Sequence, residues 1–145
     1  MIRIETELFI SAPPEKVWDV LLDFDKYPEW NPFVFFAQGE KSKGGKLLIK
    51  VNSPDGAAKV FNFTVYLNAF EPNKFLAWAG KPLLPWLFSG VHYFRLEKAG
   101  DGTLFTHGET FSGLIANMLK KELARWNCYH QTIKIFIDRY LARQA

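Results

Sequence analysis

Apolar and polar residues alternate along most of the chain, a pattern that predicts strands with one buried face. The alternation runs from Ile2 to Ile10, over 33–38, 46–51 and 60–70, through a short strand with Leu76 and Trp78, and through the two arms of the segment 89–112. Segments rich in Gly, Pro, Asn or Asp separate these stretches, as expected of turns. The pattern predicts one N-terminal strand followed by six strands arranged in hairpins.

Helical spacing appears at two places. Ser11 to Glu15 ends the first strand and starts a short helix, because proline suits the first helical turn, and a second short helix or turn carries Trp30. From Ile115 to Ala142 apolar residues recur at spacings of three and four, which predicts one long helix. Its apolar stripe consists of Leu119, Leu123, Trp126, His130, Ile133, Ile137 and Tyr140. Strands in hairpins with a terminal helix indicate an α+β domain, in which a twisted sheet wraps round the helix.

The most informative hairpin has Gly100 and Asp101 as its two central turn residues, a pair that favours a two-residue loop. This register places three pairs opposite each other: His92 with Glu109, Phe94 with His107, and Leu96 with Phe105. All six share the apolar face with Phe111, because side chains alternate along a strand. That face therefore contains three ionisable residues, in a place where charge is costly.

The preceding hairpin turns at Glu71 to Lys74. If Glu71 lies opposite Lys74, Leu67 lies opposite Trp78 and Ala69 opposite Leu76. One face of this hairpin then carries Phe63, Val65, Leu67, Leu76 and Trp78.

Length and composition limit the function classes. The 145 residues are expected to form one domain over 1–145, with 14 Phe that fill a core or line a cavity. The net charge of +3 is scattered, so no nucleic-acid partner is expected. A single cysteine fits a reducing compartment, and no signal peptide is evident. The apolar stretch from Phe75 to Phe88 is interrupted by Lys81, Pro82 and Pro85, so we expect a cytoplasmic protein without stable membrane insertion.

Several ordered motifs resemble those of the START-like, or SRPBCC, superfamily, which includes lipid-transfer domains, birch-pollen-type allergens and polyketide cyclases. Ser11 to Trp18 is similar to its opening "xAPxxxVW", and Asp25 to Pro32 to its "YPxWNP". The later segments Leu76 to Gly80, Gly90 to Leu96 and Thr106 to Leu114 resemble further signatures, the last leading into the final helix. The resemblance covers nearly the whole chain. It implies the helix-grip fold, a seven-stranded antiparallel sheet curved round a long C-terminal helix, with two short helices after the first strand and a cavity in between.

The resemblance implies a small hydrophobic ligand, lipid-like or aromatic and polyketide-like, in that cavity. Candidate ligand-binding residues are Phe63, Val65, Leu67, Trp78, Trp86, His92, Phe94, His107, Glu109, Phe111, Trp126 and His130. Such pockets combine apolar walls with a few polar groups. No phosphate-binding glycine loop, zinc-finger spacing or nucleophile elbow is present, so no cofactor or metal is expected.

His92, His107 and Glu109 admit four interpretations. They form a structural hydrogen-bonded cluster, or the polar end of a ligand pocket. They can also be the catalytic residues of a cyclase or dehydratase, with a histidine as general base and the carboxylate orienting it. Two histidines and a carboxylate also match a non-haem iron ligand set, the least favoured interpretation. A protein-interaction module without a ligand is a further alternative for the whole chain.

The segment Lys81 to Phe88 contains several apolar residues in a predicted loop, among them Leu83, Leu84 and Trp86. Such a loop exposes an apolar patch unless something covers it. It can fold over the core, form a stiff lid at the cavity mouth, or make the contact of a homodimer.

Overall fold

The computed structural model describes residues 1–53, 58–124 and 126–144; the side chains at 124, 126–132, 134 and 136 lie outside the description. The described strands are β1 (Ile2–Ile10), β2 (Val34–Gly39), β3 (Lys46–Asn52), β4 (Val60–Glu71), β5 (Phe75–Ala79), β6 (Ser89–Ala99) and β7 (Gly102–Ser112). The helices are α1 (Pro14–Leu22), a 3-10 turn η1 (Phe24–Lys26), α2 (Tyr27–Trp30), α3 (Leu114–Met118), α4 (Lys120–Ala124) and α5 (Trp126–Gln144).

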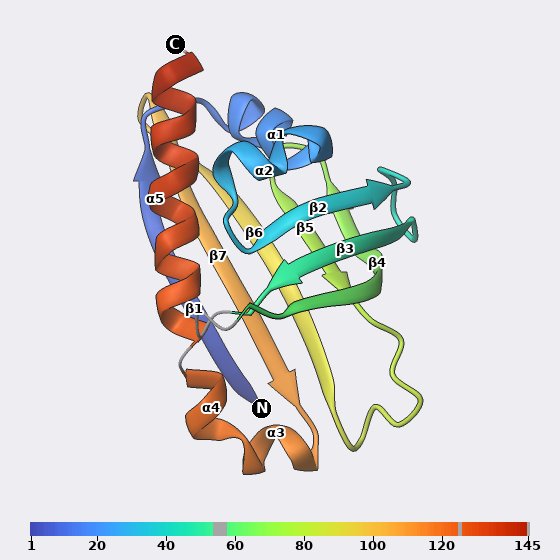
Figure 1. Cartoon of the computed structure of the whole chain (residues 1–145). Coiled ribbons are helices and arrows are strands. Elements are labelled where there is room, and N and C mark those ends of the chain that lie inside the picture. Colours follow the sequence, from blue (N-terminus) through green and yellow to red (C-terminus); the bar gives the residue numbers. More distant parts are fainter. Residues whose placement is uncertain (54–57, 125, 145) are drawn as a thin grey trace.

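The seven described strands form one antiparallel sheet in the order β1-β7-β6-β5-β4-β3-β2. The first strand pairs with the last, so the chain returns to its starting edge after six hairpin-linked strands. In Figure 1 the sheet curves, with α5 running beside β1 and β7 and the short helices α1 and α2 covering one end. This confirms the predicted α+β, helix-grip class.

Side chains from the sheet and helices form the main core. Trp18 and Leu21 of α1 and Ile133 and Ile137 of α5 pack against apolar residues of the sheet, including the fully buried Leu67. A second, smaller cluster joins the sheet to α3 and α4 through Ile4, Phe111, Ala116 and Leu123. The helices are therefore held by the buried stripes that the apolar spacing indicated.

The hairpin of β6 and β7 has the predicted register. Ala99 pairs with Gly102, which leaves Gly100 and Asp101 as a two-residue loop, and His92 lies opposite Glu109. Gly100 has a φ of 58°, a conformation that glycine adopts without strain. The turn chemistry therefore sets which residues share the inner face.

A hydrogen bond on the outer face of the sheet links β6 to β1 across the strand between them, β7. Tyr93 of β6 and Glu5 of β1 lie on either side of Gly108 in β7. The Tyr93 hydroxyl donates to a carboxylate oxygen of Glu5. A Cβ at position 108 would lie 2.3 Å from the Tyr93 ring, so only glycine leaves room for this bridge. Burial and the Glu5 carboxylate raise the pKa of Tyr93 to about 12.

Two local predictions were wrong. The β4–β5 hairpin closes with Glu71 opposite Phe75 and not Lys74, so Ala69 pairs with Ala77 instead of Leu76. A β-bulge between Leu67 and Ala69 then adds one residue to β4 only, which leaves Leu67 opposite Trp78 as predicted.

The segment predicted as one helix from Ile115 to Ala142 consists of α3, α4 and α5. Leu119 leaves the helical conformation after α3, with φ −96° and ψ 19°. The break at Leu119 lies between Ala116 of α3 and Leu123 of α4, which are both buried in a cluster with Ile4 of β1 and Phe111 of β7. Consequently Leu119 of the predicted stripe is 40% exposed.

Candidate functional site

The inner face of the sheet contains a cavity of about 480 Å³, referred to here as the sheet cavity. Strands β2 to β7 line it, and Leu123 of α4 contributes to its wall. The larger apolar residues of its lining are Val34, Ile49, Val51, Phe63, Val65, Trp78, Phe88, Phe111 and Leu123. The polar side chains are Thr64, Lys81, Ser89, His92 and Glu109. An apolar cavity with a few polar groups is the usual form of a small-molecule site.

His92 and Glu109 form part of the cavity wall on neighbouring strands. They lie directly opposite each other in the β6–β7 pairing, and both line the sheet cavity. His92 is buried and its ring stacks on Trp78, with 4.5 Å between centroids and an interplanar angle of 19°. Glu109 is half-buried. The aromatic stack therefore fixes the plane of the imidazole at the cavity wall.

His107 lies behind His92 and is fully buried. The two Nε2 atoms are 2.6 Å apart, within hydrogen-bond distance. One ring must donate and the other must accept through a lone pair, so at most one of the two rings is an imidazolium. Phe94 stacks on His107 at 4.8 Å between centroids. The cavity wall is thus backed by a pair of histidines that can hold a proton between them.

The predicted site residues separate into groups in the structure. Phe63, Val65, Trp78, His92, Glu109 and Phe111 all line the sheet cavity. Leu67 and Phe94 are buried in the adjoining core and do not line it. Trp86 is 63% exposed and lies outside the lining. Trp126 and His130 are among the residues whose side chains lie outside the described part of the chain.

The sequence reasoning missed the far wall of the cavity. Val34 of β2 and Ile49 and Val51 of β3 line it, as does Leu123 of α4. The signal was present in β3, where buried Leu47, Ile49 and Val51 alternate with exposed residues. That alternation predicted a buried face, but only the curvature of the sheet brings this face towards β6 and β7.

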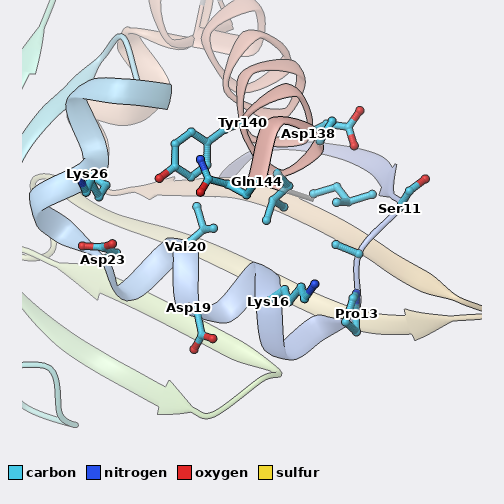
Figure 2. Close-up of a pocket in the computed structure, with 14 residues that line it drawn as sticks. Ser11, Pro13, Lys16, Asp19, Val20, Asp23, Lys26, Asp138, Tyr140 and Gln144 are labelled. Atoms are coloured by element: carbon cyan, nitrogen blue, oxygen red, sulfur yellow. The ribbon is translucent and has the colours of Figure 1, made fainter.

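A second hollow, of about 570 Å³, lies between α1 and the end of α5 (Figure 2). Figure 2 shows its charged residues along the helix edges: Lys16, Asp19, Asp23, Lys26 and Asp138. Tyr140 also lines it, and burial together with the carboxylate of Glu29 raises the pKa of that phenol. Most of the charged lining is exposed and mixed in sign. This is typical of a solvated groove and unlike a site for a hydrophobic molecule.

Metal binding was the least favoured interpretation of the His and Glu residues. Within the described residues, no group of three His, Cys, Asp or Glu side chains is arranged to hold a metal ion.

Comparison with solved structures agrees with this fold. Protein MLL2253 from Mesorhizobium loti is 18% identical, with a TM-score of 0.75 over 99% of both chains. TTHA0849 from Thermus thermophilus is 14% identical, with a TM-score of 0.75 over 99% of this chain and 100% of that one. The di-domain ARO/CYC protein StfQ from the steffimycin biosynthetic pathway is 16% identical, with a TM-score of 0.64 over 97% of this chain and 52% of StfQ. At such identities the likeness shows the fold alone.

A search of curated proteins found no match to this chain. Residues 1–128 match the family described as "Polyketide cyclase / dehydrase and lipid transport". This match spans the whole sheet and the residues of the sheet cavity. By this match the chain belongs to the polyketide cyclase/dehydrase and lipid transport family, within the START-like superfamily that its motifs resemble.

Proposed function

We propose that this protein binds a small hydrophobic molecule, lipid-like or aromatic and polyketide-like, in the sheet cavity. The observation that carries the proposal is the cavity of about 480 Å³, with apolar walls and with His92 and Glu109 side by side on two strands. The apolar wall would bury the body of the ligand, and the imidazole and carboxylate would bind one polar group such as a hydroxyl. Membership of the family supports this class of ligand.

Titration with prodan, a neutral fluorescent aromatic ketone, tests the proposal. We expect a blue-shifted, saturable emission with the wild-type protein, because the probe leaves water for an apolar wall. Val65 is buried in the cavity wall, so Val65→Phe should reduce the space available to prodan. Val60→Phe is the matched control, since Val60 lies on the same strand and is 52% exposed.

The result expected is loss of probe binding in Val65→Phe and wild-type binding in Val60→Phe, with both variants folded by circular dichroism. Equal prodan binding by all three proteins would exclude the sheet cavity as the site.

A second function, catalysis of an intramolecular aldol-type cyclisation or dehydration, is favoured by the histidine pair. A base at His92 would take a proton from a carbon beside a carbonyl of the bound molecule. The enolate carbon would then attack a second carbonyl, and the proton would return to the new alkoxide. His107, 2.6 Å from His92, would accept or supply a hydrogen bond as the charge on His92 changes. Conversion of a synthetic poly-β-ketone by the wild type and not by His92→Phe would support this function.

A further inference from the structure

One end of the molecule exposes an apolar patch that the ligand cavity does not account for. The docking patch, as we call it, consists of Leu83, Leu84, Trp86, Leu114, Met118 and Leu119. Leu83 is 98% exposed, Trp86 63% and Met118 81%, so these side chains project into solvent. Isolated exposed apolar residues are ordinary, but several on adjoining segments indicate a binding surface.

The patch is one continuous structure although it comes from two distant segments. The backbone N–H of Leu114 donates to the carbonyl of Trp86 at 3.3 Å, and that of Ile115 to the carbonyl of Leu87 at 2.9 Å. Gly113, with a φ of 100°, allows this close approach, because a Cβ there would lie 2.5 Å from the Leu87 carbonyl oxygen. Figure 1 shows the β5–β6 loop and α3 at the same end of the molecule, opposite the C-terminus. The loop is therefore anchored to α3, and its apolar tips are held outward.

The charged residues nearest the patch along the chain are Lys120, Lys121 and the exposed Glu122. Lys120 and Lys121 directly follow Leu119 and are exposed, whereas the Lys81 ammonium lies over the ring of Tyr66, 4.0 Å from its centroid. Residues 80–92 and 110–121 contain no Asp or Glu. The first acidic residue after this run is Glu122. Apolar tips combined with lysines are the pattern of a peripheral membrane-binding surface, where tryptophan favours the interface and lysines attract anionic headgroups.

We propose that the docking patch binds the surface of an anionic lipid bilayer, with its apolar side chains in the interface and Lys120 and Lys121 at the headgroups. Among the described helices none is long and apolar enough to cross a membrane, so this contact is a surface one. A second copy fits less well, because a symmetric dimer through this patch would bring Lys120 and Lys121 of both copies together. The patch also adjoins the sheet cavity, whose lining includes Lys81, Pro82 and Phe88. The proposal does not depend on the cavity being a ligand site.

Co-sedimentation with large vesicles tests the proposal. The full chain is mixed with vesicles of phosphatidylcholine alone or of phosphatidylcholine with phosphatidylglycerol. We expect binding to the anionic vesicles only, and loss of that binding at high salt, since salt screens the lysine–headgroup attraction. Leu83→Ser with Met118→Ser should lower partitioning by roughly tenfold, because two exposed apolar side chains are removed from the interface. Leu48→Ser is its control, since Leu48 is 49% exposed on β3, outside the patch.

A matched pair of charge variants distinguishes binding through the docking patch from general electrostatic attraction of the protein to anionic vesicles. Lys120→Glu with Lys121→Glu should lower partitioning to anionic vesicles by roughly tenfold or more, whereas Lys74→Glu with Lys98→Glu should leave it near the wild-type value. Lys74 and Lys98 are exposed beside the hairpin turns, and both double variants change the net charge by the same amount.

The proposal is overturned if the wild type does not bind anionic vesicles, or if both charge variants lose binding equally. A concentration-dependent dimer by light scattering that Leu83→Ser with Met118→Ser converts to monomer also overturns it in favour of a second copy. Prodan binding is measured separately on the same proteins. Val65→Phe should retain vesicle binding, so failure of this proposal and failure of the ligand proposal give different results.

Discussion

His92 and His107 share a hydrogen bond of 2.6 Å between their Nε2 atoms although they are diagonal, not opposite, across the β6–β7 hairpin. His92 lies opposite Glu109, and His107 lies opposite Phe94. Diagonal neighbours on one face of a sheet are within reach of long or aromatic side chains, which makes the contact sterically natural. The pair places one imidazole at the cavity wall and the other in the core behind it.

The first prediction concerns the energetic coupling of this pair. His92→Phe and His107→Phe should each lower the free energy of unfolding by about 1–3 kcal/mol, because each removes one partner of a buried hydrogen bond. The double variant should be more stable than the sum of the two losses by about 0.5–3 kcal/mol. Urea unfolding of the four proteins measures this coupling, and additive losses would contradict it.

The second prediction concerns Glu109 and the ligand. Glu109→Gln keeps the shape of the side chain and removes its charge. If Glu109 and His92 together bind a polar group of the ligand, the affinity for a hydroxyl-bearing probe such as 2-naphthol should fall by about 1–3 kcal/mol. Fluorescence titration measures the affinity, and Glu97→Gln is the control, since Glu97 is exposed and lies outside the cavity lining. An unchanged affinity for 2-naphthol would remove Glu109 from the site.

The third prediction compares two tryptophans. Trp86 is 63% exposed, so Trp86→Ala should change the free energy of unfolding by less than about 0.5 kcal/mol. Trp78 is 4% exposed and stacks on His92, so Trp78→Ala should cost about 3–5 kcal/mol. Denaturant unfolding of both variants tests the contrast, and a large loss for Trp86→Ala would show that this residue belongs to the core.

The fourth prediction follows from Tyr93. Its pKa rises from 10.0 to about 12 on folding, chiefly through burial and then through its hydrogen bond to Glu5. Because the folded state holds this proton more tightly, the stabilisation is fully present below pH 10 and is lost as the pH rises towards 12. Because Glu5 is exposed, solvent screens its interaction with Tyr93. The free energy of unfolding should therefore fall by roughly 1–2 kcal/mol over this pH range.

Unfolding of Tyr93→Phe between pH 9 and pH 12, the range about the raised pKa, tests this dependence. The variant should lose less stability over this range than the wild type, because it has no phenol to ionise at this position. Parallel losses in the two proteins would show that Tyr93 does not contribute to the alkaline decline.

Much of the fold follows from local pattern. Alternation located the strands, and the Gly100–Asp101 turn determined which residues of β6 and β7 lie opposite each other. Two-residue loops leave little freedom of register, which is why His92 and Glu109 could be paired from the sequence. Asn31 also acts locally: its Oδ1 accepts from the backbone N–H groups of Phe33 and Val34, as asparagine does in turns.

Other parts of the structure depend on segments that are distant in the chain. The bulge between Leu67 and Ala69 and the break between α3 and α4 at Leu119 have no signal in local propensity. The break at Leu119 lies between Ala116 and Leu123, which are buried in a cluster with Ile4 of β1 and Phe111 of β7. The β2 and β3 wall of the cavity likewise exists only because the sheet curves, which brings Ile49 and Val51 into the lining that His92 shares.

Local pattern alone was thus enough to predict the strands, the closing hairpin and the presence of ionisable residues on an apolar face. The bond between His92 and His107 and the exposure of the β5–β6 loop tips required the packed molecule. The physical reason is the range of the interactions: alternation and turn chemistry act over a few residues, whereas diagonal contacts, sheet curvature and loop anchoring depend on how separate elements pack.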